Sequence, residues 1–103
     1  VFNYLLKNNI EVLNFSSFNL NYDSEIAMVK PDHIVETICK MNHEGSDAIF
    51  VSCTALRIVE VLQKAEEKIK KTIISSNQSM IWDSIRSINI NNKISNFGKL
   101  LLN

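Results

Sequence analysis

Glycine and proline are scarce in this sequence, with two glycines and one proline among 103 residues. A phosphate-binding loop uses several closely spaced glycines, so this scarcity argues against a nucleotide site of that type. Cysteine and histidine occur only twice each, and neither shows the paired spacing of a structural zinc site. We therefore expect no bound metal. We also expect Cys39 and Cys53 to be free thiols, because no dense cysteine framework surrounds them.

An excess of charge of either sign is also missing, because eleven Lys and Arg residues balance eleven Asp and Glu residues. Without a basic stripe, binding to nucleic acid or to an anionic membrane is not expected. No apolar run approaches the roughly 18 to 20 residues of a membrane span, and the first residues do not resemble a secretion signal. We expect a cytoplasmic protein, with residues 1–103 forming one domain.

The first part of the chain contains several different periodic patterns. Residues 2–9 are typical of the last two turns of a helix, and two asparagines suit a left-handed stop there. Residues 10–15 mix apolar and polar side chains over the length of a strand. Residues 16–30 lack a period and predict a loop long enough to be functional. Pro31 fits the first turn of a helix that should end near residues 43–45.

The second part predicts two further strands and two helices. Residues 48–51 form a continuous apolar run, typical of a parallel strand that helices bury on both faces. Residues 57–70 predict a helix, residues 72–75 a strand, and Ser76 or Asn77 a cap for a final helix. The water-facing side of the first helix offers three i,i+4 pairs, Glu60/Lys64, Glu66/Lys70 and Glu67/Lys71. Strand and helix thus alternate, which predicts an α/β domain of three layers, with a short parallel sheet flanked by helices.

Cys53 lies where the predicted strand 48–51 gives way to the next helix. Ligands of open α/β sheets bind at the carboxyl ends of the strands, so a reactive side chain is well displayed there. Backbone N–H groups and the positive end of a following helix would stabilise a thiolate, and Thr54 adds a hydroxyl for binding an acid. The competing interpretation is that Cys53 is simply a small buried hydrophobe.

Four other side chains that could carry chemistry are assigned structural positions instead. Cys39 falls on the apolar side of the helix that Pro31 begins, and Trp82 has helical spacing from other apolar residues, so both are predicted in the core. His33 and His43 have no evident partner and are predicted at the surface or at helix ends.

Two sequence blocks resemble one enzyme family. The first block runs from Asp47 to Leu56 and contains Ser-Cys53-Thr54, and the second contains Ser-Ser-Asn77-Gln78 followed by Trp82. The two blocks have the order and spacing found in the carboxyl-terminal half of maleate cis-trans isomerases and arylmalonate decarboxylases, which this sequence resembles. A terminal Gly-Lys-Leu-Leu is similar to the end of that half as well. This group belongs to the aspartate/glutamate racemase superfamily.

This resemblance implies two similar α/β domains with the active site in the cleft between them, each domain supplying one cysteine. Cys53 matches the second cysteine, and the first domain is absent from this chain. In maleate isomerases the first cysteine adds to the double bond and the second takes part in proton handling. In arylmalonate decarboxylases a cysteine at the position of Cys53 protonates an enediolate. The resemblance implies no cofactor and no metal.

The resemblance also implies residues that bind substrate. Thr54 and Asn77 match the two family blocks, although each could instead cap a helix. Ser24 stands where family members often carry Asn before a Glu-Ile-Ala pattern, and it is a further candidate contact. The catalytic candidate is therefore Cys53, and the substrate-binding candidates are Thr54, Ser24 and Asn77.

The resulting hypothesis is a part of a cofactor-independent isomerase acting on a small dicarboxylic acid through cysteine thiol chemistry. A decarboxylase or an amino-acid racemase is the related alternative. A structural or binding domain without its own catalysis is the alternative from another class, because a single thiol on one wall of a cleft lacks oriented partner groups. The expected partners are the carboxylic acid, the amino-terminal domain of the same protein and, through exposed apolar surface, a second copy of the chain.

Overall fold

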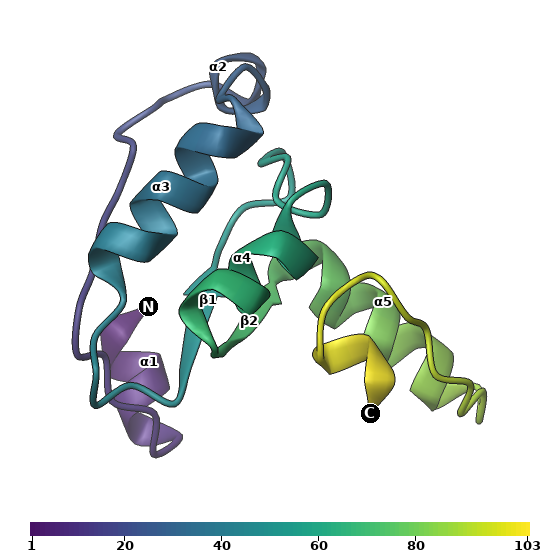
Figure 1. Cartoon of the computed structure of the whole chain (residues 1–103). Coiled ribbons are helices and arrows are strands. Elements are labelled where there is room, and N and C mark those ends of the chain that lie inside the picture. Colours follow the sequence, from purple (N-terminus) through teal and green to yellow (C-terminus); the bar gives the residue numbers. More distant parts are fainter.

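Two parallel strands and five α-helices make up the fold in this computed structural model, which describes residues 1–103. In chain order the elements are α1 (Phe2–Lys7), α2 (Asp23–Ala27), α3 (Pro31–Met41), β1 (Ala48–Val51), α4 (Leu62–Ile69), β2 (Thr72–Ser75), α5 (Ser76–Ser87) and the short 3₁₀ helix η1 (Leu100–Leu102). In Figure 1 the strand pair and α4 lie between α3 on one side and α5 on the other. The predicted α/β class, with a short parallel sheet and packed helices, is confirmed.

The two strands pair in parallel, with Ile49 opposite Ile73 and Phe50 opposite Ile74. Side chains alternate between the faces of a sheet, so Ile49 and Ile73 share one face and are buried there. On the other face, Phe50 is 53% exposed. The prediction that β1 is buried on both faces was therefore wrong, because within this chain helices cover only one of them.

The hydrophobic core lies between the sheet and helices α3 and α4. Pro31 occupies the first turn of α3, where its missing N–H costs no hydrogen bond. The apolar stripe of α3 then packs against α4. The ten buried core residues are Ile34, Val35, Ile38, Ile49, Leu56, Ile58, Leu62, Ala65, Ile69 and Ile73. No helix has both the length and the apolar character required to cross a membrane.

The strand predicted for residues 10–15 does not form. Residues 8–22 run along the outside of α3 from α1 to α2, and residues 11–15 make no backbone–backbone hydrogen bond (Figure 1). A strand needs a hydrogen-bonded neighbour, and none lies beside this segment. The prediction for residues 2–9 was correct, because α1 ends at Lys7 and Asn9 adopts a left-handed conformation with φ of 61°. Within the predicted loop 16–30, the chain forms α2.

The helix expected from residue 57 begins only at Leu62, because the preceding residues form turns. Leu56 and Ile58 are both buried, and residues two apart cannot share one helix face. The three predicted charge pairs are absent from the ion pairs of the structure, which include Arg57–Glu60 and Lys64–Asp32 instead. Glu66, expected on the water-facing side, is only 3% exposed and binds backbone N–H groups.

Helix α5 begins one residue earlier than expected, because Ser75 and not Ser76 or Asn77 is its cap. Ser75 and Gln78 form a capping box, in which each side chain binds the other residue's backbone N–H. Trp82 was predicted in the core, but it is only half-buried. Its Nε1 donates to the Asn103 carbonyl at 3.0 Å.

Candidate functional site

Cys53 lies two residues beyond the end of β1, at the carboxyl edge of the sheet. It is half-buried, its thiol is free, and it packs against the hydrophobic core. Its neighbours Ser52 and Thr54 are both exposed. The thiol therefore lies at the boundary between the core and the surface. Cys39 is likewise half-buried and packed on the core, while His33 and His43 are exposed, as predicted.

The backbone at Cys53 is strained. Its φ is 130°, whereas the five other non-glycine residues with positive φ lie between 53° and 70°, inside the left-handed helical region. A side chain with Cβ rarely adopts φ near 130°, and such outliers cost about 1–3 kcal/mol and cluster at functional sites. The surrounding structure must therefore hold Cys53 in place.

Residues in the first turn of α5 form hydrogen bonds that fix the backbone at Cys53 and at Thr54. The Cys53 backbone N–H donates to the Ser76 hydroxyl oxygen at 3.2 Å, and the Asn77 side-chain amide donates to the Thr54 carbonyl at 3.1 Å. The capping box of Ser75 and Gln78 fixes where this turn begins. We expected the helix after Cys53 to point its amino terminus at the thiol, but α4 starts eight residues beyond Thr54, at Leu62. The helix start bonded to the Cys53 segment belongs to α5.

Three of the four candidate site residues therefore come together. Cys53, Thr54 and Asn77 are joined through the α5 contacts, whereas Ser24 lies exposed in the first turn of α2 and makes no hydrogen bond with them. Ser76 is a site residue to which the sequence assigned no contact. A hydroxyl in the block next to Asn77 was the only available signal, and it fitted helix capping equally well.

Unpaired backbone donors adjoin the thiol. The N–H groups of Thr54 and Ala55 make no hydrogen bond within the chain, while the next N–H, from Leu56, donates to the Cys53 carbonyl at 3.3 Å. Such N–H groups, together with the positive end of α5, can stabilise a carboxylate. The arrangement can therefore bind an anion beside a thiol.

An ion pair braces the turn that follows the thiol. Arg57 Nε donates to Glu60 Oε1 at 2.7 Å, and Arg57 Nη2 donates to Glu60 Oε2 at 2.9 Å. The hydrogen bonding between these two side chains is the main reason that the pKa of Arg57 is raised and the pKa of Glu60 is lowered. Both side chains are exposed to solvent, so the pair serves to order the turn more than to stabilise the fold.

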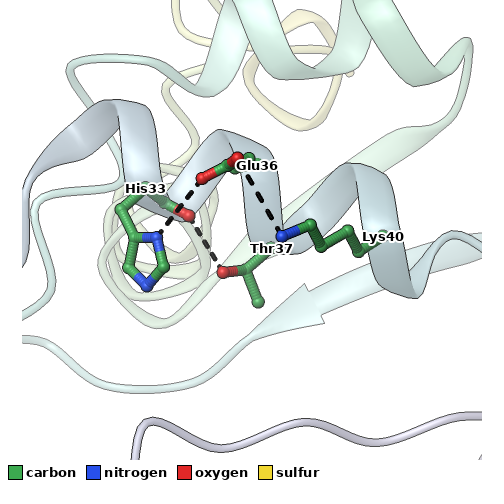
Figure 2. A network of polar contacts seen from close by, with 4 residues as sticks. All are labelled: His33, Glu36, Thr37 and Lys40. Atoms are coloured by element: carbon green, nitrogen blue, oxygen red, sulfur yellow. Dashed lines mark hydrogen bonds and ion pairs between the residues drawn. The ribbon is translucent and has the colours of Figure 1, made fainter.

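Two grooves on the surface lie away from Cys53. A groove of about 400 Å³ is lined by residues 14–18 and α3, and one of about 340 Å³ lies between α4 and the carboxyl-terminal segment. Figure 2 shows the polar network at the first groove. Glu36 pairs there with His33 at 3.5 Å and with Lys40 at 3.9 Å, and the Thr37 hydroxyl donates to the His33 carbonyl at 2.9 Å. These side chains are exposed to solvent, so their contacts form a weak surface network.

No cluster of His, Cys, Asp or Glu side chains has the form of a metal site. Fold and site together define an α/β protein that presents a thiol at the carboxyl edge of a parallel sheet, next to a helix amino terminus. Residues 1–101 match the family model described as arylmalonate decarboxylase, and the chain belongs to that family.

Known relatives agree with this assignment. The chain is 24% identical over 102 residues to maleate isomerase of Alcaligenes faecalis, covering 98% of this chain and 40% of that protein. A crystal structure of maleate isomerase from Pseudomonas putida S16 with maleate has a TM-score of 0.90 at 20% identity, covering 98% of this chain and 41% of that one. A crystal structure of arylmalonate decarboxylase has a TM-score of 0.85 at 19% identity. That match covers 97% of this chain and 45% of the decarboxylase chain. The chain thus spans less than half the length of these relatives.

Proposed function

We propose that this chain is the thiol-bearing part of a cofactor-independent isomerase that interconverts the cis and trans forms of a small dicarboxylic acid. The observation that carries the proposal is the strained Cys53 backbone, held by Ser76 beside unpaired N–H donors. The similarity to maleate isomerase supports a substrate with two carboxylates.

In this proposal Cys53 moves a proton at the carbon next to a carboxylate. A second cysteine, from outside residues 1–103, adds as its thiolate to the other carbon of the double bond and leaves negative charge on the carbon that Cys53 faces and on its carboxylate. The former double bond is then single and rotates, and expulsion of the same thiolate restores it in the trans form. The Cys53 thiol exchanges a proton with the charged carbon, while the N–H groups of Thr54 and Ala55 bind the carboxylate. Asn77 positions Thr54 by holding its carbonyl.

Decarboxylation is the second candidate function, and the match of residues 1–101 to the arylmalonate decarboxylase family favours it. Loss of carbon dioxide from a malonate leaves an enediolate, and the Cys53 thiol would donate the proton that completes the product. The same oriented thiol and N–H donors serve both reactions. The two differ in whether a second thiol is needed.

The proposed activity requires more than this chain. We propose that residues 1–103 form one domain and that another part of the same protein supplies the facing wall of the site. The chain alone then lacks the second thiol and remains inactive. Two free cysteines suit the reducing cytoplasm, where we place the protein.

Product analysis separates these candidates. The natural full-length protein is incubated separately with maleate, phenylmalonate and L-aspartate, and products are followed by NMR and chiral chromatography. We expect conversion of maleate to fumarate without added metal or cofactor. Release of carbon dioxide from phenylmalonate alone would instead establish the decarboxylase. Turnover of none of the three would contradict both functions and leave the domain with a structural or binding role.

A further inference from the structure

Residues 97–99, which we call the carboxyl-terminal strap, are bound to one face of α4. The Gly98 N–H donates to Gln63 Oε1 at 3.0 Å, and the Lys99 N–H donates to Glu66 Oε2 at 2.9 Å. The two acceptors lie three residues apart on α4 and therefore share a face of that helix. Both bonds use the backbone of the strap, so helix side chains determine where the strap lies.

Gln78 holds the strap from the other helix, α5. Its Nε2 donates to the Phe97 carbonyl, while its Oε1 accepts from the Ser75 N–H at 3.2 Å. Gln78 is only 2% exposed. A capping box forms with either Glu or Gln at this position, because the box needs only an acceptor there. Glutamate in its charged form has no donor for the Phe97 carbonyl, so the amide is the group that fits both partners.

The strap approaches Gln78 closely at Gly98. An added Cβ at Gly98 would lie 3.0 Å from Gln78 Nε2, which is closer than ordinary van der Waals contact, and it would clash with the Leu62 side chain. The φ of 83° at Gly98 is also one that a side chain with Cβ disfavours. Glycine at this position therefore permits the contact between the strap and Gln78.

The turn of α5 that contains Gln78 also holds the thiol. Ser76, which accepts the Cys53 N–H at 3.2 Å, lies between the two capping-box residues Ser75 and Gln78. Asn77 in the same turn binds the carbonyl of the residue after Cys53. A strained backbone such as that of Cys53 persists only where the surrounding structure over-determines it. A displacement of Gln78 would therefore displace the side chains that fix Cys53.

We propose that Gln78 is a positioning residue for the reaction of Cys53, and that it transmits the position of the carboxyl-terminal strap to the thiol. The strap fixes Gln78, Gln78 fixes the first turn of α5, and that turn fixes the backbone at Cys53. Gln78 acts through Ser76 and does not touch the reacting atoms. This inference rests on the proposed function, because it names residues outside the site that keep its thiol in place.

Gln78→Glu in the natural full-length protein tests this role. The substitution keeps the acceptor for the Ser75 N–H and removes the donor to the Phe97 carbonyl. A less firmly held segment opens more often, so we expect Cys53 alkylation by iodoacetamide at one fixed pH to be at least about threefold faster. Mass spectrometry of the Cys53 peptide measures this rate. For maleate we expect kcat to fall at least about tenfold while KM changes less than about threefold, because a misplaced thiol affects the chemical step.

Gln63→Met tests the strap from its exposed end, where a substitution leaves the fold intact. It removes the acceptor of the Gly98 N–H and does not alter Gln78. We expect Cys53 alkylation to be at least about twofold faster in this variant. Glu67→Met is the matched control, because Glu67 accepts the other hydrogen bond of Gln63, at 2.9 Å, and makes none with the strap. Alkylation in Glu67→Met should be unchanged.

Ile69→Ala controls for a general loss of stability. Ile69 is buried at the end of α4, just before β2, whereas Cys53 lies beyond the opposite end of the sheet. This variant should unfold at a lower urea concentration and keep the native rate of Cys53 alkylation. An unchanged rate in either Gln78→Glu or Gln63→Met would overturn the proposal, as would an equal increase in Ile69→Ala. Alkylation does not depend on turnover, so faster alkylation in a protein that does not convert maleate would refute the proposed function and retain this inference.

Discussion

The Cys53 backbone N–H donates to the Ser76 hydroxyl oxygen across 3.2 Å, joining residues 23 positions apart in the sequence. This bond connects the end of β1 to the first residue of α5. It helps to hold Cys53 at φ of 130°, a conformation that its Cβ disfavours. The position of the thiol therefore depends on a residue of the next strand–helix junction.

Replacing Cys53 by Gly should stabilise the fold relative to replacing it by Ala. Glycine has no Cβ and relieves the strain at φ of 130°, whereas alanine keeps it. We expect the free energy of unfolding of Cys53→Gly to exceed that of Cys53→Ala by about 1 kcal/mol. Urea denaturation measures this difference. The usual order, with alanine the more stable, would show that the backbone is not strained.

Ser76→Ala should loosen Cys53 without unfolding the domain. The variant leaves the Cys53 N–H without its acceptor, and a lost hydrogen bond of this kind costs about 1 kcal/mol. Ser76→Thr keeps the hydroxyl and is the matched control. We expect the rate of Cys53 alkylation by iodoacetamide at one fixed pH, measured with Cys39→Ser in the background, to rise in Ser76→Ala and to be restored in Ser76→Thr. Identical rates in all three proteins would remove Ser76 from the site.

Glu66→Leu should destabilise the fold by about 2–3 kcal/mol, because it leaves the buried N–H of Ile73 and the part-buried N–H of Lys99 without acceptors. Glu67→Leu is the control on the same helix. Glu67 is exposed, and its loss should change the free energy of unfolding by less than about 0.5 kcal/mol. Equal effects of the two substitutions in urea denaturation would contradict the role given to Glu66.

The two glycines should respond differently to alanine. Gly98 has φ of 83°, and an added Cβ would clash with Cδ2 of the buried Leu62. Strain and overpacking together predict a loss of about 2–4 kcal/mol in Gly98→Ala. At Gly45 the nearest atom to an added Cβ is His43 Nδ1 at 3.4 Å, so Gly45→Ala should be tolerated within about 1 kcal/mol. Thermal unfolding of both variants checks the contrast.

Local patterns were sufficient to predict the elements that depend on local chemistry. The bounds of β1 and β2 were correct, as were the start of α3 at Pro31 and the left-handed stop after α1. A continuous apolar run, a proline in a first turn and asparagine after a helix each act within a few residues. Cys53 could be selected for the same reason, because it follows an apolar strand directly.

Features that depend on distant residues could not be predicted. Residues 10–15 have the composition of a strand but no hydrogen-bonded neighbour within the chain. Glu66 fits a solvated helix face, yet distant N–H groups bind it in the interior. The contact of Ser76 with Cys53 also joins two separate junctions. The local pattern of a single sequence contains no information on such pairings.

The central claim is that the Cys53 thiol performs the chemistry, and a pair of serine variants tests it most directly. Maleate turnover is measured in the natural full-length protein, in Cys53→Ser and in Cys39→Ser, with the free energy of unfolding of each followed by urea denaturation. Cys39 is the other free, half-buried thiol that contacts the core, so it controls for the loss of a sulfur atom. We predict that Cys53→Ser lowers kcat at least about 100-fold at nearly unchanged stability, while Cys39→Ser keeps its activity. Full activity in Cys53→Ser would contradict the account.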